Sequence, residues 1–316
     1  MKPRLVFVHG VGGPRVPEAE LRAWSEALTE GARVAGHSRR AARLLGTGGV
    51  DARFAYYGDL FTEPHAQGAP ADLPAADPLA ELLLEVVDTR LAEAHTVTPH
   101  EARVLRRARG QLLPEGEPQG AGSVGRRALN AGNSLLALPG LRRFGGWASA
   151  RMMVSQLDQV RRYLDRAEAD ADVPSLDLRI RARVRRELDA EGPTVVVAHS
   201  LGTVVAVEAL LEHAGVVPLL VTLGSPIGMR TAVRSRMRPQ PPRVPATVGR
   251  WLNFWDRDDI IVGRPRIEDA VAANAASVRP ETRRVDSDGL WVHPAATYLA
   301  TPGVAGPVIE ALEAAG

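Results

Sequence analysis

The sequence predicts an α/β fold built on one mainly parallel sheet. Short runs rich in valine and aromatic residues alternate with longer amphipathic segments, which is the pattern of β-α-β units. Some of these runs are apolar throughout, such as Val195 to Ala198, and such runs suit strands that helices cover on both faces. The chain has 316 residues, 45% of them hydrophobic, so it can form one large core that carries an insertion.

Six strands are expected, with helical patterns in the intervals. The strands are expected at Arg4 to Val8, Ala52 to Tyr57, Thr194 to Ala198, Leu219 to Leu223, Trp251 to Trp255 and Arg283 to Val285. Helices are expected at Glu18 to Ala35, Leu201 to His213 and Val304 to Ala315. One helix follows the first strand, one follows the third and one lies after the last, as β-α-β units require.

The middle of the chain has a different pattern. From Phe61 to Glu191 no run predicts a strand, and connectors rich in proline and glycine separate arginine-studded amphipathic segments. The connectors are Glu63 to Pro78 and Leu113 to Gly125, and the helical segments are Leu79 to Ala94, Glu101 to Arg109, Trp147 to Ala169 and Leu176 to Ala190. We therefore expect an α/β core at residues 1–61 and 192–316, interrupted at 62–191 by a helical insertion that forms a cap or lid.

Composition excludes several classes of protein. The chain has no cysteine, so a disulfide scaffold, a thiol nucleophile and a cysteine-ligated metal centre are ruled out. The 39 basic and 37 acidic residues leave a formal charge of +2, which is too small to predict binding to nucleic acid. No run of about 18 apolar residues is present, and the first ten residues are not apolar enough for a signal peptide. We therefore expect a cytoplasmic protein without a membrane span.

The sharpest local motif surrounds Ser200. Residues 195–202 (VVVAHSLG) describe a buried strand that ends in a serine and turns at once into a helix. The motif resembles the nucleophile elbow of the α/β-hydrolase superfamily, in which a strained turn lifts a serine hydroxyl above the sheet. Ala198 and Gly202 are the small flanking residues that such a turn needs, although alanine stands where glycine is usual. A second interpretation is a serine that caps an ordinary helix.

A glycine-rich loop at residues 9–13 (HGVGG) follows the first expected strand. In the α/β-hydrolase superfamily a His-Gly pair at this place begins the oxyanion loop. The resemblance implies that the N–H groups of Val11 and Leu201 bind the oxyanion. A dinucleotide-binding loop is a competing interpretation, but its third glycine is replaced by Arg15 and Pro14 interrupts the helix start.

A base and an acid must accompany the serine, and the resemblance suggests where they lie. His293 stands in a loop between the last expected strand and the final helix, where the superfamily places its base. Three carboxylates follow the strand that ends at Trp255; Asp259 fits the family segment best, Asp258 next, and Asp256 better suits a turn. A solvated acidic turn is the other interpretation of this cluster.

The three candidates follow the order Ser, Asp, His of α/β-hydrolases, with 59 residues from Ser200 to Asp259 and 34 from Asp259 to His293. The resemblance, which covers about residues 1–61 and 192–316, implies an α/β-hydrolase fold that lacks the first two strands of the full fold. The expected sheet order starts with the strand at Ala52, continues with that at Arg4, and then follows the chain. The implied activity is lipase-like serine esterase chemistry on a small-molecule acyl substrate, with no metal or organic cofactor.

Four residues are candidates for contact with the substrate. Trp255 and Trp291 are candidates for an aromatic mouth, and Trp147 and Met152 for an acyl channel under the insertion; packing in the core is the alternative for each. We expect the insertion to control access and to take no part in the chemistry. A thioesterase, a peptidase, an acyltransferase and a catalytically silent binding protein on the same fold stay open, as does the oligomeric state.

Overall fold

The computed structural model describes residues 2–62, 76–92, 97–113, 121–138, 149–167, 169, 172–257, 259, 261–262, 266–287 and 292–316. Within these residues one six-stranded sheet has the order β2-β1-β3-β4-β5-β6, and all five pairings are parallel. The strands are β1 Arg4–Val8, β2 Asp51–Ala55, β3 Thr194–His199, β4 Leu220–Leu223, β5 Trp251–Trp255 and β6 Pro280–Arg284. The six expected strands and the expected order are confirmed.

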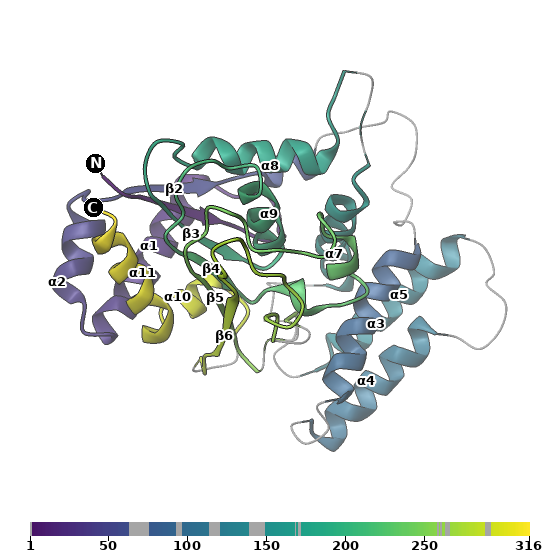
Figure 1. The fold of residues 1–316 in the computed structure, drawn as a ribbon. Helices are drawn as coiled ribbons and strands as arrows, with labels where there is room; N and C mark the ends of the chain where they lie inside the picture. Colours follow the sequence, from purple (N-terminus) through teal and green to yellow (C-terminus); the bar gives the residue numbers. More distant parts are fainter. Residues whose placement is uncertain are drawn as a thin grey trace.

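Helices surround this sheet, as Figure 1 shows. The helices of the described residues are α1 Pro17–Val34, α2 Ser38–Ala41, α3 Ala76–Ala92, α4 Pro99–Leu112, α5 Ala121–Leu135, α7 Ala150–Asp165, α8 Leu176–Glu187, α9 Leu201–Leu210, α10 Ala295–Leu299 and α11 Pro302–Ala314. Shorter turns are η1 Ala42–Gly46, η2 Gly58–Phe61, η3 Pro226–Gly228 and η4 Arg234–Arg236. No helix in the described ranges is long and apolar enough to cross a membrane.

Two hydrophobic cores lie on the two faces of the sheet. In β1, Leu5 and Phe7 point into one core, with residues of α1, α10 and α11, while Val6 and Val8 point into the other. Successive side chains of a strand point to opposite faces, so a strand that is apolar throughout contributes side chains to both cores. This arrangement explains why the central strands were easy to predict from continuous apolar runs.

The edge strand β6 differs from its expected bounds. It spans Pro280–Arg284 and pairs only with β5, whereas the sequence placed it at Arg283 to Val285. Three of its five residues are charged, and its side chains are mostly exposed. An edge strand with one solvated side needs no apolar pattern, so hydrophobicity alone did not locate its start.

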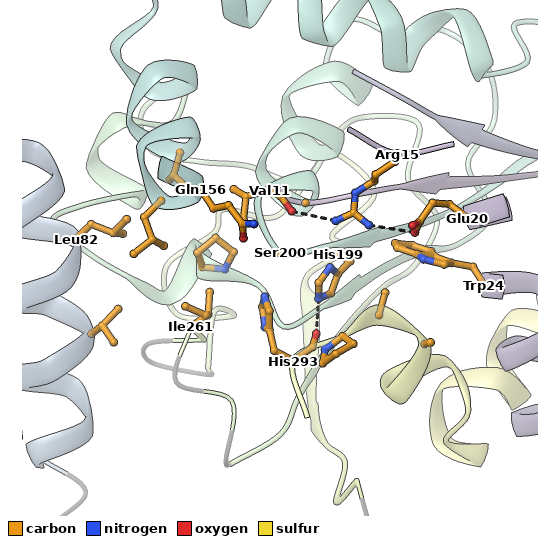
Figure 2. Close-up of a pocket in the computed structure, with 18 of the residues that line it drawn as sticks. Val11, Arg15, Glu20, Trp24, Leu82, Gln156, His199, Ser200, Ile261 and His293 are labelled. Carbon is orange, nitrogen blue, oxygen red and sulfur yellow. Dashed lines mark hydrogen bonds and ion pairs between the residues drawn. The ribbon is translucent and has the colours of Figure 1, made fainter. Parts of the chain in front are cut away.

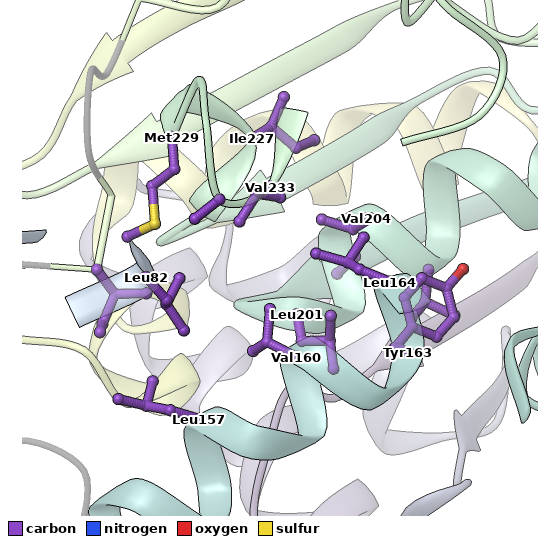
Figure 3. Packing of buried hydrophobic residues seen from close by; sticks show 14 of the residues in the cluster. Leu82, Leu157, Val160, Tyr163, Leu164, Leu201, Val204, Ile227, Met229 and Val233 are labelled. Carbon is purple, nitrogen blue, oxygen red and sulfur yellow. The ribbon is translucent and has the colours of Figure 1, made fainter. Parts of the chain in front are cut away.

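The segment between β2 and β3 forms helices in the described ranges. Helices α3, α4, α5 and α7 pack against one another, while α8 packs on α9 and β2. The core on the α9 side of the sheet continues without a break into this group. Figure 3 shows that continuity: Val160 of α7 lies beside Leu201 of α9, and Leu164 lies near Val204.

Helix α5 was not expected at its position. It starts at Ala121, inside the segment that was expected to be a connector from Leu113 to Gly125. Its glycines lower its intrinsic helix propensity, but Ala128, Ala131 and Leu135 recur at helical spacing and are buried. Tertiary packing of that stripe therefore outweighs local propensity.

Candidate active site

Ser200 stands at a strained turn between β3 and α9. Its backbone has φ 53° and ψ −131°, a combination that residues other than glycine rarely adopt. Its N–H donates to the Leu223 carbonyl oxygen at 3.0 Å, which ties the turn to β4. Its hydroxyl makes no capping hydrogen bond to α9. The interpretation of Ser200 as an ordinary helix cap therefore does not fit, because the turn presents the hydroxyl elsewhere.

Close contacts between backbones hold this turn in place. A Cβ atom on Gly202 would lie 2.2 Å from the His9 carbonyl oxygen, and one on Gly10 would lie 2.5 Å from the Ser200 Cβ. Both distances are far below van der Waals contact, so the loop after β1 and the turn after β3 require glycine at these positions. Ala198, in contrast, is fully buried and its methyl group packs in the core. The turn therefore has room for alanine at position 198, where glycine is usual.

His293 and Asp259 form a buried pair above the sheet. The His293 Nδ1 atom lies 2.8 Å from Asp259 Oδ2. Asp259 also accepts from the Tyr298 hydroxyl at 2.8 Å and, through Oδ1, from the Ile261 N–H at 3.0 Å. Gly224, with φ 53°, makes room for the pair, since a Cβ there would lie 2.7 Å from Asp259 Oδ2. These contacts orient the carboxylate toward the imidazole.

Asp256, the other described carboxylate of the cluster, has a different role. Asp256 is buried and accepts from both the N–H and the hydroxyl of Ser287, so it holds the loop that follows β6. Its own N–H donates to the Tyr298 hydroxyl oxygen at 3.1 Å. Asp258 lies outside the described residues. Of the described carboxylates in the cluster, Asp259 is the one that pairs with His293.

Tyr298 and His199 support the same pair. Burial, with the nearby charge of Asp259, raises the pKa of the Tyr298 hydroxyl well above its usual value, so Tyr298 stays a hydrogen-bond donor. Burial, with the proximity of His293, lowers the pKa of His199 well below its usual value, so its ring is neutral. His199 Nε2 lies 2.6 Å from the His293 carbonyl oxygen and holds that backbone in place.

His9 organises the glycine-rich loop. Its Nδ1 atom lies 2.6 Å from the Gly10 carbonyl oxygen, and its Nε2 accepts from the Tyr57 N–H at 3.2 Å. Burial first, and then the charge of Arg15, lower the pKa of His9 to about 3. A neutral ring with its proton on Nδ1 satisfies both contacts. His9 and His199 therefore orient loops, and neither has the surroundings of a base that works near neutral pH.

The expected oxyanion donors are the N–H groups of Val11, in the loop after β1, and of Leu201, the first residue of α9. The Val11 N–H donates to no group in the described part of the chain, and the Leu201 N–H opens α9 and has no partner within that helix. The neighbouring Val11 carbonyl oxygen accepts from Arg15 at 3.1 Å, which fixes the orientation of this stretch of the loop. Arg15 also pairs with Glu20 at 3.1 Å.

A cavity of about 270 Å³ contains this site. It is lined by Gly10, Val11, Arg15, Glu20, Ala23, Trp24, Leu82, Val86, Gln156, Leu157, Val160, His199, Ser200, Pro226, Met229, Ile261, His293, Pro294, Ala295 and Ala296. Figure 2 shows Ser200 and His293 at its centre, Leu82 and Ile261 on one side, and the Arg15–Glu20 pair on the other. The cavity thus has an apolar half toward α3 and α7 and a polar half toward α1.

The expected substrate contacts are only partly described. Trp147 and Trp291 lie outside the described residues. Met152 belongs to α7, but its side chain is not among the described ones. Trp255 is half-buried on β5 and does not line the cavity. The cavity is lined instead by Trp24 of α1, which sequence reasoning missed because it lies far in sequence from the motifs.

No group of three or more histidine, aspartate or glutamate side chains that could hold a metal ion occurs within the described residues. Comparisons of the chain with protein-family models, with curated proteins and with solved structures found no match.

Proposed function

We propose that this chain is a serine hydrolase with an α/β-hydrolase fold that cleaves an ester or a related acyl bond. The observation that carries the proposal is the buried His293–Asp259 pair, which shares one cavity with a serine in a strained turn whose hydroxyl caps no helix. A nucleophile, a base and a group that orients the base are the components of acyl transfer by serine.

The proposed reaction begins at Ser200. His293 takes the hydroxyl proton as the Ser200 oxygen attacks the acyl carbon, and Asp259 stabilises the imidazolium that forms. His293 then donates that proton to the leaving oxygen, so the alcohol departs and an ester between the acyl group and Ser200 remains. Water attacks this acyl-enzyme with His293 again as the base, which releases the acid and restores the serine.

The oxyanion of each tetrahedral intermediate is bound by two backbone donors. The Val11 N–H belongs to the loop after β1, which lines the cavity together with Ser200, and the Leu201 N–H opens α9 directly after Ser200. Donors of this kind act most strongly where water is excluded, and the surroundings of Ser200 are almost fully buried. The nearby start of α9 adds a partial positive charge.

The cavity supports a small substrate with an apolar acyl group. Its volume of about 270 Å³ lies near the lower end of the roughly 300–1,000 Å³ that small-molecule sites span. The apolar half, with Leu82, Val86 and Leu157, suits the acyl chain, and the half with Arg15 and Glu20 suits a polar leaving group. The proposed substrates are therefore esters of short to medium acyl chains.

The test is hydrolysis of a series of p-nitrophenyl esters from acetate to decanoate by the purified full chain. We expect turnover by the wild type and loss of at least about 10³-fold in Ser200→Ala, because the nucleophile is removed. Ser155→Ala changes an exposed serine of α7 and serves as the matched control, with unchanged rates expected.

Two results would contradict the proposal. Absence of turnover on every ester, with the protein folded, would favour the catalytically silent binding protein. Equal rates in wild type and Ser200→Ala would place any observed hydrolysis elsewhere. A thioesterase or a peptidase on the same residues would instead show Ser200-dependent turnover of thioesters or amides that exceeds that of the esters.

A further inference from the structure

We infer that Gln159 of α7 is a positioning residue for the oxyanion loop, so that the insertion contributes to the chemical step. This inference rests on the proposed function, because it concerns the loop that would bind the oxyanion. The sequence analysis, in contrast, predicts that the insertion controls access to the site and takes no part in the chemistry. Gln159 does not line the cavity, so its proposed effect does not pass through contact with substrate.

The side-chain amide of Gln159 occupies both polar groups of Gly12. Its Oε1 accepts from the Gly12 N–H at 3.0 Å, and its Nε2 donates to the Gly12 carbonyl oxygen at 3.0 Å. Two hydrogen bonds from one planar amide fix the orientation of the peptide groups on both sides of Gly12, as a neighbouring strand would. The residue that precedes Gly12 is Val11, whose N–H is the proposed donor.

The loop depends on such external contacts. Gly12 has φ 155°, a conformation open to glycine and costly for other residues, and glycine leaves many other conformations accessible. Arg15 holds the Val11 carbonyl oxygen from the other side at 3.1 Å. Gln159 and Arg15 together hold the Val11–Gly12 peptide by its oxygen and its N–H. Without Gln159 only the contact from Arg15 remains.

Helix α7 is itself attached to the helix that carries the second donor. The Tyr163 hydroxyl donates to Glu208 at 2.7 Å, and Arg166 forms an ion pair with the same carboxylate at 2.6 Å. Glu208 is fully buried on α9, whose first residue is Leu201. Gln159 and Tyr163 lie four residues apart and so share one side of α7, and Arg166 follows directly after the last residue of the helix, Asp165.

This geometry links the two proposed donors through one element. The side of α7 that carries Gln159 and Tyr163 contacts the loop of Val11 at one end and α9 at the other. The distance between the Val11 and Leu201 N–H groups then depends on α7. An oxyanion site loses rate when its donors shift by a fraction of an ångström, so a helix that fixes their spacing affects turnover.

The test compares Gln159→Leu with Gln111→Leu. Gln111 lies in the same insertion, and its amide oxygen accepts from Ser134 within that insertion, so the control makes the same chemical change away from the loop. The readouts are kcat and KM for p-nitrophenyl acetate and the inhibition constant of an alkyl trifluoromethyl ketone, which forms a tetrahedral oxyanion on a serine.

For Gln159→Leu we expect a loss of kcat of about 10- to 100-fold, KM within about twofold of wild type, and ketone affinity weakened by a similar factor as kcat/KM. Gln159→Glu, which keeps the acceptor for the Gly12 N–H but loses the donor, should fall between Gln159→Leu and wild type. Gln111→Leu should match the wild type. Thermal unfolding of each variant reports whether it is folded. If Gln159→Leu does not fold, the kinetics of Gln159→Glu are compared with those of Gln111→Leu instead.

Several results would overturn the inference. These are kinetics of Gln159→Leu that equal those of Gln111→Leu, a rise in KM with kcat unchanged, or ketone affinity that stays at the wild-type value while kcat falls. In each of these cases wild-type turnover that depends on Ser200 would leave the proposed function standing. Absence of that turnover in the wild type would instead count against the proposed function itself.

Discussion

The carboxyl edge of the sheet and the helical insertion are held together by different kinds of contact. At the sheet edge, backbone packs on backbone: a Cβ on Gly202 would lie 2.2 Å from the His9 carbonyl oxygen. In the insertion, the tight contact of Gly132 is with the Met153 Cε atom, the far end of a flexible side chain. Backbone contacts cannot relax without moving a strand or a helix, whereas a methionine side chain can rotate.

This difference explains what each region can do. A rigid edge suits groups that must stay within a few tenths of an ångström, such as Ser200 and the His293–Asp259 pair. The insertion presents apolar side chains such as Leu82 and Leu157 to the cavity, and these can change size without disturbing the sheet. Gln159 is the exception, because it lies in the insertion and holds the rigid edge.

The largest expected effect concerns the acid at the sheet edge. Asp259→Asn should lower kcat for p-nitrophenyl acetate by about 10⁴-fold, because the amide cannot stabilise the imidazolium and favours the wrong tautomer of His293. Asp256→Asn is the matched control, since Asp256 contacts Ser287 and not His293, and its loss should be far smaller. Steady-state kinetics on both variants measure the difference. Equal losses would mean that Asp259 is not the acid of the pair.

The second prediction compares two glycines. Gly202→Ala should lower the free energy of unfolding by at least about 3 kcal/mol, because the added methyl group meets backbone oxygens of β1 and the following loop. Gly132→Ala should cost clearly less than Gly202→Ala, because the nearest atom is the flexible end of Met153, the Ala150 Cβ at 3.2 Å needs a shift of only a few tenths of an ångström, and alanine favours the helix. Urea unfolding of both variants checks the comparison. A larger loss of unfolding free energy in Gly132→Ala than in Gly202→Ala would mean that the insertion is packed more rigidly than the sheet edge.

The third prediction uses pH. The pKa of His9 is about 3 in the folded state, against 6.5 for an ordinary histidine, so between these values the unfolded chain binds a proton that the folded chain does not. His9 therefore contributes stability that is present above pH 6.5 and is lost as pH falls toward 3, by about 1.4 kcal/mol per pH unit.

Urea midpoints at pH 7 and pH 4.5 measure this slope. His9→Asn should make the pH dependence shallower than in wild type, whatever its stability at pH 7. His100→Asn replaces an exposed histidine of α4 and should keep the wild-type slope. If the slope of His9→Asn matched that of wild type, His9 would not be buried in a neutral form.

The smallest expected effect lies in the cavity. Leu157→Ala should shift the preference of kcat/KM toward longer acyl esters by about 1–3 kcal/mol and leave acetate nearly unchanged, because Leu157 lines the apolar half. Leu105→Ala removes an equally buried leucine of α4 that does not line the cavity, and it controls for loss of packing. The same shift in both variants would mean that the acyl chain does not lie against α7.

Local patterns in the sequence account for much of the sheet and its motifs. β1 and β5 have the predicted bounds because four of the five residues in each are apolar, whereas β6 is a polar edge strand without such a pattern. The sequence favoured Asp259 over Asp256 by resemblance alone; the contacts with His293, Tyr298 and Ile261 supply the physical reason.

The contacts that sequence reasoning missed are long-range pairings of side chains. Gln159 and Gly12 are 147 residues apart, and nothing in the run around either one indicates the other. Glu208, buried within the apolar helix α9, was a signal for a partner, because a buried carboxylate requires one. The identity of that partner, Arg166 with Tyr163, emerges only from the packing of α7 on α9.

We propose that the sheet edge activates Ser200 as a nucleophile, and this activation can be measured directly. Its most direct test is the intact mass of the folded full chain after treatment with a fluorophosphonate, which phosphonylates activated serines and displaces fluoride. The account predicts one adduct on the wild type, located on Ser200 by peptide mass, and none on Ser200→Ala or on heat-unfolded protein. An adduct that persists in Ser200→Ala, or a folded wild type that takes none, would contradict it.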